Sequence, residues 1–345
     1  MTSSPPTEQP PLLEVRDLVK HFPVGRSLVN TLRRTPPAAV RAVDGVSFSV
    51  AKGQTLALVG ESGCGKTTTG RCVLFLQHPT SGEVLVNGEP INPADEAAMR
   101  RRRKQLQIVF QDPNSSLNPR MTVGQTLGEV LQFHKMAGGG DQQRAVAELL
   151  ETVGLSGRHA GRYPNELSGG QRQRVGIARA LAVNPELVVA DEPVSALDVS
   201  VQAQILQLLE RLRDERGLAY LFISHDLGVV RHIADDVAVM YLGVIVERAP
   251  TAALYERPLH PYTQALLAAA PVANPRLRRK RAPIPGDPPS PLAPPSGCRF
   301  RTRCPFAAER CATEVPLLRQ LEPGHWVACH FAEELRSAPR ADGLP

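Results

Sequence analysis

Three short apolar runs dominate the hydrophobic pattern: TLALVG at residues 55–60, ELVVADEP at 186–193 and LAYLFISHD at 218–226. Each run is continuous rather than alternating, which is typical of parallel strands that are covered on both faces. A glycine loop and a helical pattern follow the first run, and helical patterns follow the other two. The sequence therefore predicts an α/β fold with a mainly parallel sheet.

Weaker signals predict further elements around these strands. Residues 12–22 alternate as an edge strand does, and residues 43–50 resume a strand, so we expect an antiparallel β edge. Residues 23–41 contain Gly, Pro and Arg and indicate a surface insertion. In VGQTLGEVLQFHKM and QRAVAELLETVGL, apolar residues recur every three or four positions. They predict a helical subdomain, at about residues 112–183, inserted into the α/β core.

The chain changes character after Pro271. The stretch PIPGDPPSPLAPPSG indicates a stiff linker, and a small segment rich in cysteine follows it. A length of 345 residues accommodates one large domain and an appendage. We therefore expect two domains, at residues 1–271 and 272–345.

Composition narrows the class of protein. With 42% apolar and 21% charged residues, the chain has the profile of a soluble globular protein. No apolar run approaches the roughly 20 residues that span a bilayer, and MTSSPPTEQPP lacks the features of a secretory signal. The sequence thus predicts a cytosolic protein.

The net charge of +6 permits anionic partners, so each basic run is a candidate nucleic-acid site. The run at residues 100–104 leads directly into the apolar stretch QIVFQD, which indicates the end of a short helix. The second run, RLRRKR, lies at residues 276–281. Aromatic residues make up only 4% of the chain, too few for base-stacking platforms. We therefore expect no nucleic-acid partner.

The stretch GESGCGKTT follows a predicted buried strand and opens a helix, and it fits the phosphate-loop pattern G-x-x-x-x-G-K-[ST]. Glycines let backbone N–H groups curl around a phosphate, and the helix N-terminus adds positive charge. Lys66 can reach the β- and γ-phosphates, the Thr67 hydroxyl can bind Mg²⁺, and Cys64 is expected to be a small filler. The predicted nucleotide-binding residues here are Gly60, Glu61, Ser62, Gly63, Cys64, Gly65, Lys66, Thr67 and Thr68.

A second predicted strand ends in two acids. Asp191 lies at the tip of LVVADE, where a carboxylate can hold Mg²⁺, and Glu192 can polarise a water that attacks the γ-phosphate. The alternative role for Glu192 is to cap the helix that starts near Val199. Together with the phosphate loop, these residues predict a P-loop NTPase.

The stretch NELSGGQRQR supplies a second anion-binding helix start, about 100 residues after the first. One nucleotide site does not need two such starts, whereas two sites shared across a head-to-tail dimer do. We expect Ser168, Gly169, Gly170 and Gln171 of each chain to close on the nucleotide of the other.

These motifs together resemble the ATPase subunits of ABC transporters, and the resemblance extends over essentially the whole chain. Gly60–Thr67 matches Walker A, Leu187–Asp191 matches Walker B, and Leu167–Gln171 matches the signature motif. The resemblance implies bound ATP and Mg²⁺ and assigns the remaining site residues. It assigns Gln111 to the Q-loop, Asp198 to the D-loop at the dimer seam, His225 to the γ-phosphate switch and Phe22, where Tyr is usual, to the adenine.

The same resemblance assigns roles in the reaction. Lys66, Glu192 and His225 are implied to be catalytic, while Thr67, Gln111 and Asp191 are implied to hold Mg²⁺. Soluble ABC ATPases of DNA repair or the ribosome and purely regulatory nucleotide sensors remain as alternatives.

HPYTQALLAA at residues 260–269 and PSPLAPPSGCRFRTRCPFA are similar to the peptide-importer branch of the family, in its second-ATPase-subunit type. This implies import of dipeptides or oligopeptides, with nickel as the alternative solute in the same branch. It implies as partners two integral membrane permease subunits, a sister ATPase or a second copy of this chain, and indirectly an extracytoplasmic solute-binding protein. The implied location is the cytoplasmic face of the cell membrane.

Cys298, Cys304, Cys311 and Cys329 gather in the C-terminal segment, with 5, 6 and 17 residues between them. A reducing cytosol disfavours disulfides, and four thiolates suit an iron–sulfur cluster or a structural zinc. The family resemblance favours a 4Fe–4S cluster over zinc. His330 is a further candidate ligand, although we expect it to be a bystander.

Overall fold

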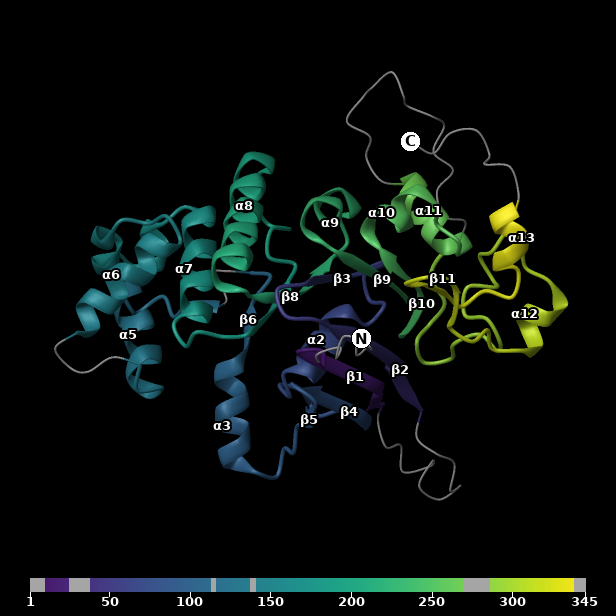
Figure 1. Cartoon of the computed structure of the whole chain (residues 1–345), viewed down its shortest axis with the longest axis horizontal. Helices are drawn as coiled ribbons and strands as arrows, with labels where there is room; N and C mark the ends of the chain where they lie inside the picture. Colours follow the sequence, from purple (N-terminus) through teal and green to yellow (C-terminus); the bar gives the residue numbers. More distant parts are fainter. Residues whose placement is uncertain (1–9, 25–37, 113–115, 137–140, 270–285, 338–345) are drawn as a thin grey trace, which may run out of the picture.

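The computed structural model describes residues 10–24, 38–112, 116–136, 141–269 and 286–337. Within these residues the strands form two sheets, of order β2-β1-β4-β5 and β11-β12-β10-β9-β3-β8-β7-β6 (Figure 1). The strand bounds are β1 Leu13–Pro23, β2 Ala39–Val50, β3 Thr55–Val59, β4 Ser81–Val86, β5 Glu89–Pro90, β6 Leu106–Val109, β7 Leu187–Asp191, β8 Ala219–Ser224, β9 Asp236–Tyr241, β10 Val244–Pro250, β11 Arg319–Glu322 and β12 His325–Val327.

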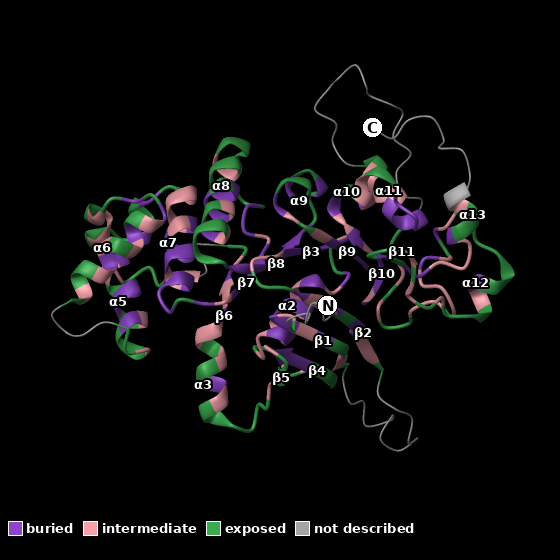
Figure 2. Ribbon diagram, viewed as in Figure 1, coloured by how far each residue is buried: buried purple, intermediate pink, exposed green. Residues whose placement is uncertain are grey.

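The larger sheet confirms the predicted α/β fold. Strands β9, β3, β8, β7 and β6 pair in parallel, whereas β10, β12 and β11 extend the sheet in antiparallel fashion. The three continuous apolar runs of the sequence became β3, β7 and β8, and every residue of these strands is buried (Figure 2).

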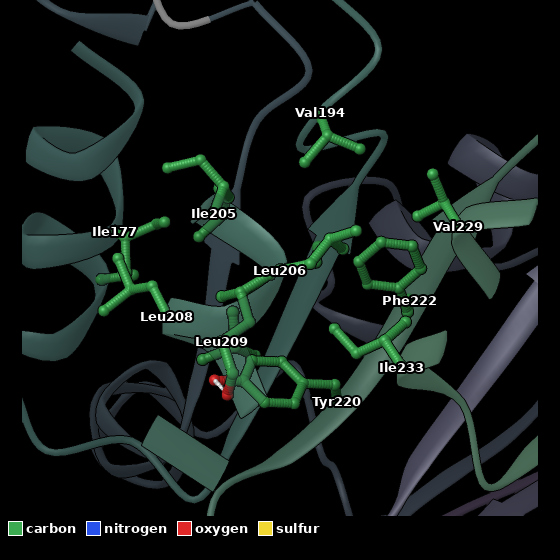
Figure 3. Close-up of a cluster of buried hydrophobic side chains, with 14 of the residues drawn as sticks. Ile177, Val194, Ile205, Leu206, Leu208, Leu209, Tyr220, Phe222, Val229 and Ile233 are labelled. Carbon is green, nitrogen blue, oxygen red and sulfur yellow. Dashed lines mark hydrogen bonds between the residues drawn. The ribbon is translucent and has the colours of Figure 1, made fainter. Parts of the chain in front are cut away.

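The central strands are apolar throughout because their two faces contribute to two different cores. Tyr220 and Phe222 of β8 face one core, packed against helices α8 and α9, while Leu221 and Ile223 face the other. Figure 3 shows the first core, in which the Tyr220 hydroxyl donates a hydrogen bond of 3.1 Å to the carbonyl of Leu209 on α8. The second core lies between the sheet and β1, β2 and β4.

The N-terminal antiparallel sheet differs from the sequence-based expectation in one respect. The sequence predicts an edge strand at residues 12–22, but β1 lies inside its sheet, between β2 and β4. Leu13 pairs with Val50 on one side and with Val86 on the other. Local alternation cannot reveal that second, non-local partner. Most of the surface insertion expected at residues 23–41 lies outside the described residues.

Helices cover both faces of the sheet and form a separate cluster beyond its β6 edge. Figure 1 shows α8, α9 and α10 on one face, α2 on the other, and α5, α6 and α7 together, as the periodicity predicts. The bounds are α2 Lys66–Val73, α3 Glu96–Gln105, α5 Val123–Phe133, α6 Gln142–Thr152, η1 Gly157–Gly161, η2 Pro164–Glu166, α7 Gly169–Leu181, α8 Val199–Arg216, α9 Leu227–Ile233, α10 Thr251–Glu256, α11 Pro261–Ala269, α12 Glu309–Thr313 and α13 Ala332–Ser337. Among the described residues, no helix is both long and apolar enough to cross a membrane.

The C-terminal segment packs directly on the α/β core. Strand β12 pairs with β10, and the Phe300 ring lies 5.2 Å from the ring of Tyr241. Glu247 of β10 is fully buried and accepts hydrogen bonds of 2.7 and 3.0 Å from the backbone of Leu259 and His260. The division at residues 271 and 272 stays a prediction, since β11 and β12 continue the core sheet. The basic run at residues 276–281 lies outside the described residues.

Candidate functional site

The site begins in the loop between β3 and α2, at the carboxyl end of the parallel strands. Gly60 and Gly65 have φ values of +151° and +109°, which favour glycine. A Cβ at Gly60 would lie 2.1 Å from the carbonyl oxygen of Met240, and one at Gly65 would lie 2.0 Å from that of Ala42. The loop is therefore pressed against neighbouring backbone, and larger residues would displace it.

Lys66 is buried at the start of α2. Its Nζ donates hydrogen bonds to the carbonyls of Gly60, at 2.8 Å, and Glu61, at 3.0 Å. The ammonium thus bridges the two ends of a short stretch of the loop, and the sequence predicts that the N–H groups of this loop bind phosphate. Cys64 lies in the same loop, and burial raises the pKa of its thiol. A thiol that stays protonated is unreactive, which agrees with the prediction that Cys64 is a small packing residue.

Two of the three predicted magnesium ligands, Thr67 and Asp191, contact each other, whereas the third, Gln111, donates a hydrogen bond to Glu192. The Thr67 hydroxyl donates a hydrogen bond of 2.8 Å to Oδ1 of Asp191. Asp191 is only 3% exposed, and this burial raises the pKa of its carboxyl group, against the opposing effect of the Thr67 hydrogen bond. Hydroxyl and carboxylate oxygens are hard ligands that suit Mg²⁺, and the cation's charge would offset the cost of burying the carboxylate.

Glu192 joins three loops that follow adjacent strands. Its Oε2 accepts a hydrogen bond of 2.8 Å from Gln111, after β6, and its Oε1 lies 3.2 Å from Nδ1 of His225, after β8. The backbone of Glu192 has a φ of +47°, which is uncommon for a residue with a side chain and is concentrated at functional sites. The helix-cap alternative finds no support, because Asp198 occupies the N-cap position of α8.

A pocket of about 520 Å³ is lined by many of the predicted site residues, although Gly60, Cys64 and Asp191 are not among them. Nine of the predicted site residues line it: Ser62, Gly63, Gly65, Lys66, Thr67, Thr68, Gln111, Glu192 and His225. Sequence reasoning missed three others, Val40, Ala42 and Pro291. No local motif marks these three residues. The carbonyl of Pro291, for example, accepts a backbone hydrogen bond of 3.1 Å from Arg41, which lies 250 positions earlier in the chain, and a contact between such distant residues leaves no local pattern.

Phe22 does not line this pocket. It is paired with Val40, which does, and the Lys20 ammonium lies 5.0 Å from the centre of its ring. The adenine-stacking role of Phe22 therefore stays a prediction.

The signature motif starts α7 as expected, away from the pocket lining. Ser168 is the N-cap, and its hydroxyl accepts from the N–H of Gln171, while the Gln171 side chain accepts from the N–H of Ser168. Helix geometry leaves the N–H groups of Gly169 and Gly170 without a partner inside the helix. This pair of donors fits the anion-binding role, and its use by a second chain stays a prediction.

The four C-terminal cysteines line one small pocket together with His330. All six cysteines of the chain are described and carry free thiols. Burial and the neighbouring cysteines raise the pKa of Cys304 to about 11 and that of Cys329 to about 12. The expected metal site is not supported, because no group of three or more His, Cys, Asp or Glu side chains in the described part of the chain has the arrangement that holds a metal ion. The positions of the cysteines in the sequence predict that the four thiols lie near one another, but not whether they are arranged as metal ligands.

Two family models match the chain. The model of the ABC transporter covers residues 43–195, and that of the oligopeptide/dipeptide transporter C-terminal region covers residues 246–311. The second match spans the join between the α/β core and the cysteine-rich segment, which agrees with the continuous sheet.

Curated relatives match almost the whole chain. The oligopeptide transport ATP-binding protein AppF of Bacillus subtilis is 52% identical over 326 residues, which cover 94% of this chain and 98% of the relative. The probable peptide ABC transporter ATP-binding protein y4tS of Sinorhizobium fredii is 53% identical over 319 residues, or 92% of this chain and 89% of the relative.

A solved structure of the ATP-binding cassette MJ0796, dimeric and bound to ADP and Pi after hydrolysis, is 30% identical with a TM-score of 0.60. It covers 69% of this chain and 98% of its own. Because relatives more than half identical match nearly the full length, the protein belongs to the ABC transporter family, as an ATP-binding protein with the C-terminal region of the oligopeptide/dipeptide transporters.

Proposed function

We propose that this chain binds and hydrolyses ATP to power the import of dipeptides or oligopeptides across the cytoplasmic membrane. The observation that carries the proposal is the pocket in which Lys66, Thr67, Gln111, Glu192 and His225 meet. The names of the relatives, which are transport ATP-binding proteins for peptides, and the matched C-terminal region support the choice of solute.

In the proposed reaction, Glu192 acts as the general base for the attacking water. Gln111 and His225 hold its two carboxylate oxygens, so the group is oriented before the nucleotide arrives. Thr67 and Asp191 would hold Mg²⁺, which neutralises phosphate charge when bound. Lys66 would replace its hydrogen bonds to the carbonyls of Gly60 and Glu61 with hydrogen bonds to phosphate oxygens.

The proposed working unit is a pair of ATPase subunits on the cytoplasmic face of the membrane, bound to two permease subunits. The partner ATPase is a sister subunit or a second copy, and an extracytoplasmic binding protein delivers the solute. Ser168–Gly170 of each chain would complete the other's nucleotide site, so ATP favours the closed pair. Two solved structures of the cassette MJ0796, which resembles this chain, are described as dimeric, and this supports the pairing.

An uptake assay tests the proposal. In a strain that lacks this chain, the unaltered gene should restore uptake of labelled dipeptides or oligopeptides, and a Glu192→Gln variant should not. Restored nickel uptake without peptide uptake would select the alternative solute. If affinity purification from membranes recovers no integral membrane subunits, the transport function is wrong and a soluble ABC ATPase is favoured.

We also propose that the four C-terminal cysteines hold a 4Fe–4S cluster, with zinc as the second candidate. The support is that the four cysteines line one pocket beside Phe300, Phe306 and Phe331. A bound cation would favour the thiolates over the thiols that burial otherwise favours.

Metal analysis tests this second proposal. Protein purified without oxygen should contain iron and sulfide and show the visible absorption of a cluster, and Cys304→Ser should remove both. Cys72→Ala is the matched control, because Cys72 lies on α2 in the other core and should leave the metal content unchanged. Colourless protein with one zinc per chain would select zinc, and metal-free protein would overturn the proposal.

A further inference from the structure

An ion pair connects the cysteine-rich segment to the phosphate-binding loop. Nη1 and Nη2 of Arg303 donate hydrogen bonds of 2.6 and 3.0 Å to the two carboxylate oxygens of Glu61. Glu61 directly follows Gly60 in the loop, whereas Arg303 lies 242 positions later and directly precedes Cys304. The two side chains form the parallel, two-bond geometry that makes arginine–carboxylate pairs strong.

The surroundings of the pair are closed to solvent on the arginine side. The Arg303 side chain is only 4% exposed, and that of Glu61 is 25% exposed. The hydrogen bonds to Glu61 raise the pKa of the guanidinium above its usual value, so the charge is maintained. Breaking a pair of this kind is costly because the buried charge would lose its counterion.

The backbone of Glu61 is held by the same part of the fold. Its N–H donates a hydrogen bond of 2.8 Å to the hydroxyl of Tyr262, on α11. The rings of Tyr262 and Tyr241 lie 4.6 Å apart, and Phe300 packs on both at 5.3 and 5.2 Å. Residues outside the loop thus hold Glu61 by its side chain and by its backbone.

This attachment leads directly to the phosphate-binding lysine. The Glu61 carbonyl accepts a hydrogen bond of 3.0 Å from Nζ of Lys66. A shift of Glu61 would therefore move both the loop backbone, whose N–H groups face the phosphates, and a partner of the lysine that binds them.

We propose that Arg303 is a positioning residue for ATP binding, which holds the phosphate loop in its binding conformation through the carboxylate of Glu61. In this role the C-terminal segment acts on the nucleotide site without contacting the reacting atoms. Preorganisation of this kind lowers the cost of ordering the loop and increases affinity. At saturating ATP the phosphates themselves order the loop, so the maximal rate depends little on Arg303.

Other contacts attach the C-terminal segment to the core, so its docking does not rest on Arg303 alone. Arg299 contacts the carboxylate of Asp44 and the carbonyl of Leu242. Arg257 pairs with Glu322 of β11 at 2.9 Å, away from the phosphate loop. Arg257→Gln is therefore a matched control, since it removes an ion pair between core and segment and leaves Glu61 untouched.

The test compares Arg303→Met, Glu61→Gln and Arg257→Gln in the full-length protein. Binding of MgATP is measured by titration with a fluorescent ATP analogue, and KM and kcat are measured by phosphate release. Arg303→Met and Glu61→Gln should each raise the dissociation constant and KM about tenfold, with kcat changed less than about twofold. Arg257→Gln should leave both constants unchanged.

A double-mutant cycle and a conservative variant separate positioning from general loosening. Because the two side chains act through one another, the double variant should bind ATP no more weakly than either single variant. Arg303→Lys should restore only part of the affinity, since lysine keeps the charge but not the two-bond geometry. Normal affinity in both single variants, or fully additive losses, would overturn the proposal. If Arg303→Met does not fold, Arg303→Lys decides, and normal affinity in that variant would overturn the proposal.

Discussion

Replacing Glu192 with glutamine should lower the rate of ATP hydrolysis by about 10² to 10⁴-fold, the usual contribution of a general base. Glutamine has nearly the same shape as glutamate. With its amide oxygen toward Gln111 and its amide nitrogen toward His225, it can keep the two contacts that Glu192 makes at 2.8 and 3.2 Å. It cannot accept the proton of the attacking water. ATP binding should therefore persist while turnover stops, and phosphate release together with equilibrium ATP binding measures the two effects separately.

The same variant should accumulate as an ATP-bound dimer, because the nucleotide that joins two chains is no longer consumed. Size-exclusion chromatography with MgATP detects this species. Glu148→Gln provides the matched control, since Glu148 is an exposed residue on α6 that pairs with Arg144 across one helical turn. Unchanged turnover in Glu192→Gln would refute its role as the base.

The sequence predicts the parts of the fold that depend on local pattern. The strands TLALV, LVVAD and AYLFIS are apolar throughout because both faces are buried, and this property is visible in the residues themselves. Strands β11 and β12 have only four and three residues, and they form because β12 pairs with β10. Such pairing depends on distant residues, so no pattern within β11 or β12 predicts it.

The candidate site divides in the same way. Lys66, Thr67, Asp191 and Glu192 belong to motifs in which strand, loop and helix are consecutive, so their meeting follows from the parallel sheet. The contribution of Pro291 to the same pocket depends on contacts between distant parts of the chain, and nothing in its own neighbourhood signals it.

Arg303 is a clearer example of a residue whose role the sequence alone does not predict. In the sequence it is one of several arginines between two cysteines, and the cysteines draw attention to metal binding. Its ion pair with Glu61 becomes visible only once α11 and the aromatic cluster around Phe300 place the segment beside the loop. A long-range contact of one charged side chain leaves no periodicity or spacing in the sequence, so the fold must be known first.

Replacing Lys66 with alanine should weaken MgATP binding by about 100-fold. Lys66 is buried, and its ammonium is the positively charged side chain with which the phosphate loop binds the phosphates. The loss has two parts. Alanine cannot bind phosphate oxygens, and it also removes the hydrogen bonds that tie the carbonyls of Gly60 and Glu61 across the loop. Hydrolysis at ordinary ATP concentrations should fall in parallel with occupancy.

Titration with a fluorescent ATP analogue measures the loss, and circular dichroism checks that the variant is folded. Lys52→Ala is the matched control, because Lys52 is an exposed residue in the turn between β2 and β3 and does not line the nucleotide pocket. A folded Lys66→Ala protein that binds MgATP as tightly as the unaltered chain would contradict the assignment of this loop to phosphate. It would also remove the reason for expecting Arg303 to affect ATP affinity, since Arg303 acts on the nucleotide only through that loop.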